Sequence, residues 1–488
     1  MSGGLDGGRI GFPAFVFAAL AACTQPSERV HGDTDGDDAR DVVGDARDDG
    51  ADGREADGAD GDGDGGTAEC LPGGRGCRGD LVVACDGDGH PTGAVIEDCV
   101  PDACVAGLCV DPCGPEALAR SYSGCVFYAV DLPQWGQPLA GFGTIAANQQ
   151  FAVAVANPWD VDMDVVVEQN DAAPGEAPIV TEAAAVTVGP NSLQEIPLPP
   201  REVSGYGGPG LSEPNRSMVT ARAYRIRASR PATVYQFNPA NNPNAFSNDA
   251  SLLMPVNALS ESYVALGWPG MGGINLPLIG LSDNRPFLTI VATQAGTRVR
   301  VVTSTPVMAG DGVPEILAGE EFVVTLGEFE ALNLEGGNYA RFGETDFTGT
   351  RVEADAPVAV WSGVECITVG EGCCCDHLEE QLFPRSSLGT EYVAVRSKAR
   401  ASEPDYFRIL ALDDGTSVET SLGGADRSLR WRRARCARSR APATSRLLRA
   451  RPSWSASSSR ARTRPGEPAI RRSCWSRRWR STGRATSS

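Results

Sequence analysis

The chain has 488 residues, with 43 Lys or Arg and 63 Asp or Glu, so its formal net charge is −20. The charge is unevenly spread: residues 427–488 hold nineteen Arg and one acid, which leaves 24 basic against 62 acidic side chains in residues 1–426. This acidic body lacks the positive surface that nucleic acids and anionic membranes require, so both are excluded as partners.

The N-terminus has the pattern of an export signal. Arg9 precedes an apolar run over residues 10–22, which is too short to span a bilayer. The run ends in Leu-Ala-Ala-Cys at residues 20–23, a tetrad that resembles the bacterial lipobox. We therefore expect residues 1–23 to be a lipoprotein signal peptide, Cys23 to be lipidated, and the protein to be anchored in the outer membrane by lipid, or extracellular. A plain signal peptide with a chance cysteine is the alternative.

Residues 24–68 consist almost entirely of Asp, Gly, Ala and Arg. Such a segment cannot bury enough apolar surface to offset the entropy lost on ordering. We expect a disordered acidic tether.

Eight cysteines follow within 56 residues, and residues 69–119 are predicted to form a small disulfide-rich module. Zinc is the rival interpretation, but the spacing lacks paired Cys-x-x-Cys knuckles and His90 is the only nearby imidazole. The pairing stays open, because eight cysteines allow 105 connectivities. The disulfide candidates are Cys70, Cys77, Cys85, Cys99, Cys104, Cys109, Cys113 and Cys125.

Residues beyond 120 form an internal repeat with β periodicity. Residues 253–265 are echoed by residues 382–394, and residues 287–299 by residues 406–418, while Phe151 opens an earlier copy. We predict an all-β protein made of tandem β-sandwich-like repeats, preceded by the disulfide-rich module and the tether. The copies are β repeat 1 at 120–252, β repeat 2 at 253–381 and a partial β repeat 3 at 382–426.

Two prolines occupy equivalent places in the first two copies. Residues 223–235 align with residues 349–361, which places Pro231 opposite Pro357. Because proline cannot donate to a strand ladder, we expect both at strand starts.

Residues 427–488 change abruptly to Arg, Ser, Ala, Pro and Trp. Strand alternation stops where the third copy should continue, so we expect a disordered, Arg-rich tail that arises from a shifted reading frame. A genuine basic arm for nucleic acid or anionic glycans is the alternative.

Catalytic residue types are scarce. The chain has three histidines, His31, His90 and His377, and it lacks the common hydrolase, metalloprotease and nucleotide-binding motifs. We therefore predict no enzymatic activity and no cofactor.

A dense cluster of thiols and polar groups lies near residue 370. Cys366, Cys373, Cys374 and Cys375 are an even set of disulfide candidates. The alternative is a soft-metal site formed by His377, Cys373 and Cys375, in a metal-binding protein or a metal-dependent enzyme centred on residues 366–377.

Several segments together resemble one known family. Residues 121–132, the strand from Phe151, the motif Asp-His-Leu-Glu-Glu-Gln at residues 376–381 and residues 389–393 are similar to the N-terminal domain family of IgGFc-binding protein. The motif residues are Asp376, His377, Glu379, Glu380 and Gln381. The resemblance covers residues 120 to about 425 and implies a secreted or lipid-anchored surface protein, similar to those of myxobacteria, that binds an unidentified protein or glycan ligand in adhesion or recognition.

Overall fold

The computed structural model describes residues 70–451, except 71, 101, 116–117, 119–120, 136–145, 205–215, 242–246, 273–274, 277–278, 281–282, 371–374, 396, 399–404, 421–426, 431–435 and 442–446. These residues divide into two compact units, residues 1–109 and residues 110–488, which are described separately. Cys23, His31, the tether, Cys373, Cys374 and residues 452–488 lie outside the described residues.

The first unit is a small β module held by disulfides. It contains a three-stranded antiparallel sheet in the order β1-β2-β3 and a separate β4-β5 pair. The strands are β1 (Arg75–Arg78), β2 (Leu81–Cys85), β3 (Pro91–Asp98), β4 (Ala103–Val105) and β5 (Leu108–Val110). Val82 and Val83 on β2 are buried, whereas every residue of β3 is exposed. A core of this size needs covalent support.

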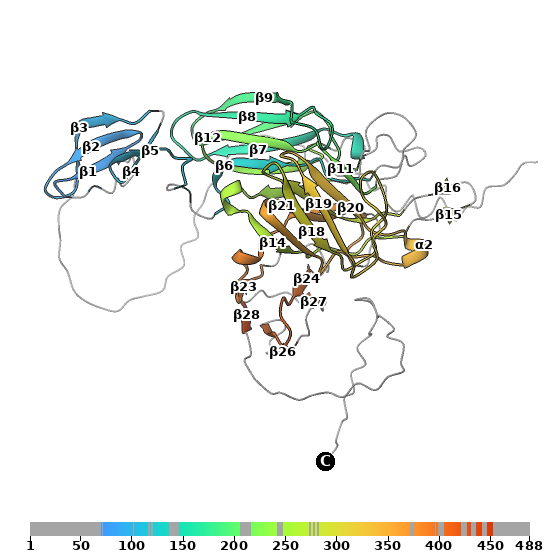
Figure 1. Ribbon diagram of the computed structural model, residues 1–488. Coiled ribbons are helices and arrows are strands. Elements are labelled where there is room, and N and C mark those ends of the chain that lie inside the picture. Colours follow the sequence, from blue (N-terminus) through green and yellow to red (C-terminus); the bar gives the residue numbers. More distant parts are fainter. Residues whose placement is uncertain are drawn as a thin grey trace, which may run out of the picture. The chain divides into compact units, whose positions relative to one another are not determined.

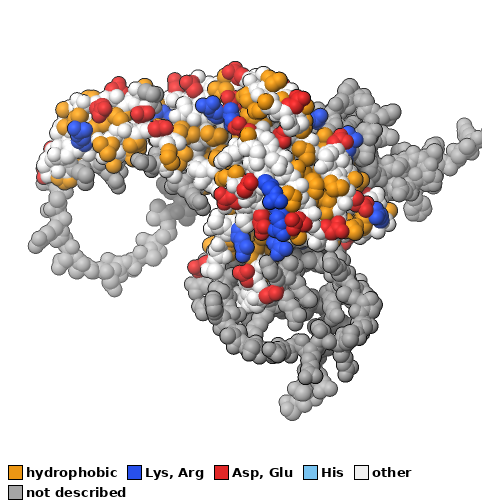
Figure 2. Space-filling model, in the orientation of Figure 1, with side chains coloured by type: hydrophobic (Ala, Val, Ile, Leu, Met, Phe, Trp, Pro, Cys, Tyr) orange, Lys and Arg blue, Asp and Glu red, His pale blue; other side chains and the backbone are white. Residues whose placement is uncertain are grey.

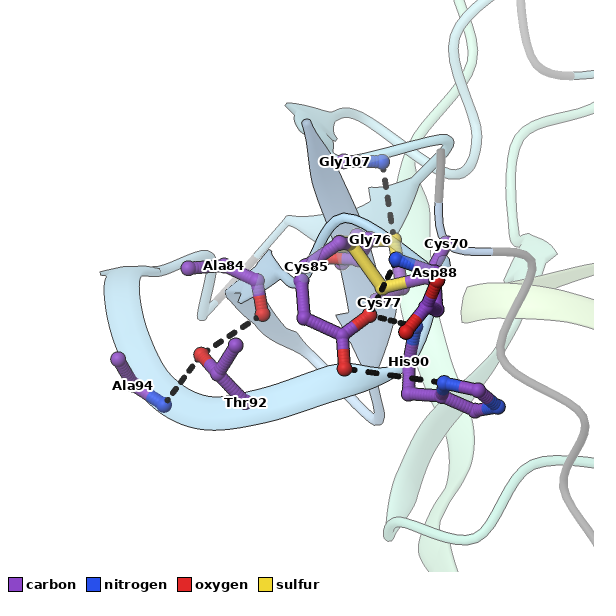
Figure 3. The surroundings of a disulfide bond; sticks show 12 residues. Cys70, Gly76, Cys77, Ala84, Cys85, Asp88, His90, Thr92, Ala94 and Gly107 are labelled. Atoms are coloured by element: carbon purple, nitrogen blue, oxygen red, sulfur yellow. Dashed lines mark hydrogen bonds and ion pairs between the residues drawn. A yellow bond between two sulfur atoms is a disulfide. The ribbon is translucent and has the colours of Figure 1, made fainter. Parts of the chain in front are cut away.

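Four disulfides account for the eight cysteines of residues 70–125. The pairs are Cys70–Cys85, Cys77–Cys104, Cys99–Cys109 and Cys113–Cys125. Figure 3 shows the Cys70–Cys85 bond beside Gly76, where an added Cβ would lie 2.6 Å from the Cys70 sulfur. The backbone N–H of Gly107 also donates to the Cys77 sulfur at 3.2 Å. Glycines therefore let the backbone approach the sulfur atoms closely.

The second unit begins with the first repeat, drawn from cyan to green in Figure 1. Strand β12 is the centre of two sheets: its first half pairs with β6 and β8, and its second half with β7 and β13. Strand β9 continues the first sheet beside β8, and β10 continues the second beside β7. The strands are β6 (Gly124–Ala129), β7 (Phe151–Asn157), β8 (Met163–Asn170), β9 (Val180–Val188), β10 (Ser192–Leu198), β11 (Met218–Thr220), β12 (Tyr224–Asn238) and β13 (Asp249–Leu253), with the 3-10 turn η1 (Ala146–Asn148).

The second repeat has the same topology. Strand β21 takes the place of β12: its first part pairs with β14 and β18, and its later part with β17 and β22. Strand β19 lies beside β18, and β20 lies beside β17. The elements are η2 (Val256–Ala258), β14 (Ser260–Val264), β15 (Asn275–Leu276), β16 (Ile279–Gly280), β17 (Pro286–Ala292), β18 (Thr297–Val302), β19 (Glu321–Leu326), β20 (Ala331–Glu335), α2 (Tyr339–Phe342), β21 (Arg351–Ile367) and β22 (Asp376–Gln381).

Pro231 and Pro357 lie inside β12 and β21, so the expectation of strand starts was wrong. Residues 224–228 of β12 belong to one sheet and residues 233–238 to the other, and Pro231 falls between them. Pro357 falls at the equivalent point of β21, between Ala354 and Val358. A strand that changes sheets has residues without ladder partners at the crossing, where a missing N–H costs nothing.

The third repeat follows the same pairing pattern. Strands β23 and β25 pair with β28, β25 also pairs with β26, and β24 pairs with β27. The elements are η3 (Arg385–Ser387), β23 (Glu391–Val393), β24 (Asp405–Leu410), β25 (Ser417–Thr420), β26 (Arg427–Arg430), β27 (Cys436–Ala441) and β28 (Leu447–Arg451).

Within the segment expected to be a disordered tail, the described residues Arg427–Arg430, Cys436–Ala441 and Leu447–Arg451 form strands. The physical reason lies in the backbone, because the edges of β24 and β25 offer unpaired N–H and C=O groups. Any extended chain can satisfy these groups, including one rich in arginine.

Two hydrophobic clusters hold the second unit together. One is the core of the first repeat, and it also contains Phe287, Phe329 and Trp361 from the second repeat. The other is the core of the second repeat, with Leu288 and Ile290 of β17. Alternate residues of β17 therefore point into different clusters, so the two repeats share an apolar junction.

Candidate functional site

The family motif forms β22, at the edge of the second repeat. Its alternate side chains His377, Glu379 and Gln381 are buried, whereas Asp376 and Glu380 lie at the surface. Strand β22 pairs with β21 on one side. Its other side faces β13 of the first repeat, so the motif lies at the junction of the two repeats.

Side chains join β13 to β22 in place of a backbone ladder. The Glu379 N–H donates to Asp249 Oδ2 at 2.9 Å, and the Gln381 N–H donates to Ser251 Oγ at 2.8 Å. In the opposite direction, the Met254 N–H donates to Gln381 Oε1 at 2.6 Å. A further bond of this kind runs from the Asn248 N–H to Asp376 Oδ1 at 3.0 Å. We call this set of bonds the clasp; it satisfies two sheet edges that would otherwise be open.

A buried imidazole and carboxylate lie at the centre of the junction. His377 Nδ1 is 3.2 Å from the Glu365 carbonyl oxygen, and His377 Nε2 is 3.2 Å from Glu379 Oε2. Because a carbonyl oxygen only accepts, Nδ1 must carry a hydrogen. The contact between Nε2 and Oε2 therefore also needs a proton, held on either the histidine or the acid.

The pKa values agree with a retained proton. Burial disfavours the charged imidazole most strongly, but the hydrogen bond and charge of Glu379 outweigh it and raise the pKa of His377. Burial also raises the pKa of Glu379, against the opposing effect of His377. The His377 ring stacks on Phe287 with 5.8 Å between ring centres. This pair fits the interior of a junction better than a catalytic site, because both side chains are shielded from solvent.

Gln236 extends the network into the first repeat. Its Nε2 donates to Glu379 Oε1 at 2.9 Å, and its Oε1 accepts from the Val130 N–H at 3.1 Å. Next to Val130, Asp131 is buried and accepts from the Arg201 N–H at 2.8 Å. Burial raises the pKa of Asp131 to about 7, and nearby Glu379 adds to the effect. A continuous polar path therefore crosses the junction.

Phe329 anchors the other side of the junction. It lies between β19 and β20 with φ of 69°, a left-handed conformation that bulky residues rarely adopt. Its ring is fully buried, packs edge-on against Tyr128 at 6.0 Å and lies 4.7 Å below the Arg225 guanidinium. Arg225 also pairs with Glu168 and with Glu328. The matching turn of the first repeat has Asn191 at φ of 46°, a residue that tolerates this conformation.

The cysteine cluster is part of the same region. Cys366 and Cys375 form a disulfide that closes the loop before β22. In this state Cys375 has no thiolate for a metal, and both nitrogens of His377 already have partners. Across the part of the chain that the structure describes, no three His, Cys, Asp or Glu side chains are arranged to hold a metal ion.

Sequence reasoning found the motif but missed its partners. Asp249, Ser251 and Gln236 lie more than a hundred residues away, and only the sheet order brings them to β22. A signal was present at Asp249 and Ser251, because these polar residues alternate just before the repeat start at Leu253. Phe329 gave no comparable signal.

Among the described residues, no helix is long and apolar enough to cross a membrane. Figure 2 shows acidic and basic side chains intermingled on the visible face.

Comparison with known proteins covers the side of this junction that the second repeat and β13 form. Human IgGFc-binding protein is 32% identical over 177 residues, which cover 36% of this chain and 3% of the relative. The chain therefore aligns with a very small part of that protein. No solved structure matches significantly. Residues 249–433 match the family described as IgGFc binding protein, from the clasp strand β13 into the third repeat, which confirms the resemblance expected from the sequence.

Proposed function

We propose that the chain is a cell-surface lipoprotein whose β repeats recognise a protein or glycan ligand, without catalysis, in adhesion. The observation that carries the proposal is the match of residues 249–433 to the IgGFc binding protein family. The human relative is named for binding the Fc part of IgG, which favours a protein ligand. The motif itself is an unsuitable contact surface, because three of its side chains are buried in the junction.

The proposed location rests on two further observations. Five disulfides are present among the described residues, and such bonds persist in oxidising compartments. The lipobox-like tetrad that ends at Cys23 supports a lipid anchor. Cys23→Ala should release the protein from membranes. An unmodified mature N-terminus, seen by mass spectrometry in the wild type, would refute lipidation.

Binding is tested with the exported, oxidised protein immobilised on a sensor surface. IgG Fc is the first probe and the Fab fragment of the same antibody its matched control, followed by a glycan array. Saturable binding of Fc without Fab, or of a defined glycan class, supports recognition. If neither probe set binds above the level of reduced, unfolded protein, the recognition proposal fails.

The metal-dependent alternative gains no support from the described cluster, because Cys375 is in a disulfide and His377 is fully engaged.

A further inference from the structure

At the junction between the first two repeats, the two faces of strand β17 pack into different hydrophobic cores. On β17, Leu288 and Ile290 point into the core of their own repeat, while Phe287 and Val291 point outward into the core of the first repeat. The outward face of β17 thus rests on the preceding repeat, near Tyr128 and Val130 at the end of β6.

The next junction uses equivalent segments. Arg408 on β24, the strand that corresponds to β17, reaches back to the second repeat. It lies over Trp268 at 5.1 Å and pairs with Asp346 at 2.8 Å, and its side chain is buried. Trp268 lies beyond β14 much as Leu132 lies beyond β6. The outward face of β24 therefore also contacts the preceding repeat, but through Trp268 and Asp346 rather than through β14, and Leu266, the equivalent of Val130, is 38% exposed.

The first repeat has the same outward face, and no β repeat precedes it among the described residues. We call this the head face; its residues are Ala152, Ala154, Ala156, Leu193, Glu195, Pro197, Thr233, Tyr235 and Phe237. Only Glu195 among these nine is charged. Leu193 and Tyr235 are 62% and 38% exposed, whereas Ala152 and Ala154 at the centre of the face are buried. The head face has the apolar character of a docking face.

The third repeat carries a segment that corresponds to the first repeat's side of the junction. By the repeat alignment, Val393 and Val395 correspond to Tyr128 and Val130 of the first repeat. Tyr128 and Val130 are 2% and 0% exposed under the second repeat, whereas Val393 and Val395 are 69% and 72% exposed. We call Val393–Val395 the tail segment.

We propose that copies of this chain associate head to tail, with the head face of one copy covering the tail segment of another. The occupant follows from the molecule, because the equivalents of these two surfaces meet at the junction between the first and second repeats. A heterologous contact of this kind propagates into chains of copies unless it closes into a ring. At a cell surface, such assembly would multiply whatever recognition sites the repeats carry. The proposal does not depend on Fc recognition.

Sedimentation velocity on the full-length, oxidised protein tests this, with Cys23→Ala in every sample so that a lipid cannot cause association. We expect species larger than the monomer whose fraction grows with concentration. Leu193→Glu blocks the head and Val395→Glu blocks the tail, and each should weaken association at least about tenfold because a charge would be buried in an apolar contact. Ile179→Glu is the matched control, since Ile179 is also exposed on the first repeat but lies beside β9, away from the head face.

Mixing the two blocked variants separates this model from other modes of association. Leu193→Glu retains a tail and Val395→Glu retains a head, so an equimolar mixture should form heterodimers that grow no further. A monomer at all concentrations, an equal effect of Ile179→Glu, or a mixture that stays monomeric while the wild type associates would each overturn the proposal.

Discussion

Replacing Glu379 with leucine should damage the repeat junction far more than its single hydrogen bond to His377 suggests. In Glu379→Leu, the His377 ring loses the partner 3.2 Å from Nε2, and Gln236 Nε2 loses its acceptor at 2.9 Å. Both groups are fully buried, so water cannot replace the lost carboxylate. Breaking a buried charged pair by removing one partner costs about 3–5 kcal/mol.

The double variant His377→Leu/Glu379→Leu shows whether the pair acts as a unit. Removing both partners leaves two neutral groups, the Gln236 amide and the Glu365 carbonyl oxygen, without these hydrogen bonds. An unmet neutral group costs about 1–3 kcal/mol, which is less than an uncompensated buried charge. The double variant should therefore be more stable than Glu379→Leu alone. Glu353→Ala is the matched control, because its ion pair with Arg300 is exposed and should contribute less than about 1 kcal/mol.

Urea unfolding followed by tryptophan fluorescence measures these differences, since Trp361 is buried in the junction. With a urea dependence of about 2 kcal/mol per M, Glu379→Leu should lower the midpoint by about 2 M, and the double variant by about 1 M. If the double variant unfolds at the same or a lower urea concentration than Glu379→Leu, His377 and Glu379 are energetically independent. The interpretation that His377 and Glu379 share a single proton would then be wrong.

Four further predictions follow from the same geometry and sequence. His377 has a raised folded pKa, so its stabilisation is complete below its unfolded pKa of about 6.5 and is lost as the pH rises through the folded value. Asp131, with a folded pKa of about 7, also favours the folded state at lower pH. The urea midpoint should therefore fall as the pH rises from 5 to 8. A midpoint that stays constant or rises over this range would contradict the predicted direction. Phe329→Asn relieves the left-handed strain but removes a buried ring, so the free energy of unfolding measured in urea should fall by about 2–4 kcal/mol. An unchanged or higher stability would mean that the ring does not anchor the junction. Reduction should unfold residues 70–109, which three disulfides hold, before the β repeats, because each closed loop contributes about 2–4 kcal/mol; thiol counts on exported protein that find these cysteines free would refute the framework. Resequencing the gene should reveal another frame beyond codon 426 that resumes alternating Val, Leu, Phe and Thr; if neither alternative frame does so, the basic tail is genuine.

Periodicity was enough to predict the all-β class, because the alternation at residues 297–302 and 322–326 corresponds to β18 and β19. The run Phe151-Ala-Val-Ala-Val-Ala lacks polar positions, which is typical of a strand covered on both faces, and β7 carries the apolar head face. The crossing of β12 and β21 between two sheets was not predictable, because a proline at a strand start and one at a sheet crossing satisfy the same backbone rule.

The junction was predictable only in part. The motif at residues 376–381 was visible, but its role depends on Asp249 and Ser251 in another repeat and on the sheet order that brings β13 beside β22. Phe329 illustrates a stronger limit. Local preference argues against phenylalanine at positive φ, and only its contacts with Tyr128 and Arg225 in the first repeat explain the choice.

Amide hydrogen exchange at Glu379 and Gln381 tests most directly whether the family motif clasps two repeats together. These two N–H groups point away from the β21 ladder, and each bonds to a side chain of β13. We predict that both exchange as slowly as the amides of β21 in the wild type, and that Ser251→Ala selectively accelerates Gln381. Exchange at the rate of an open edge strand in the wild type would contradict the clasp.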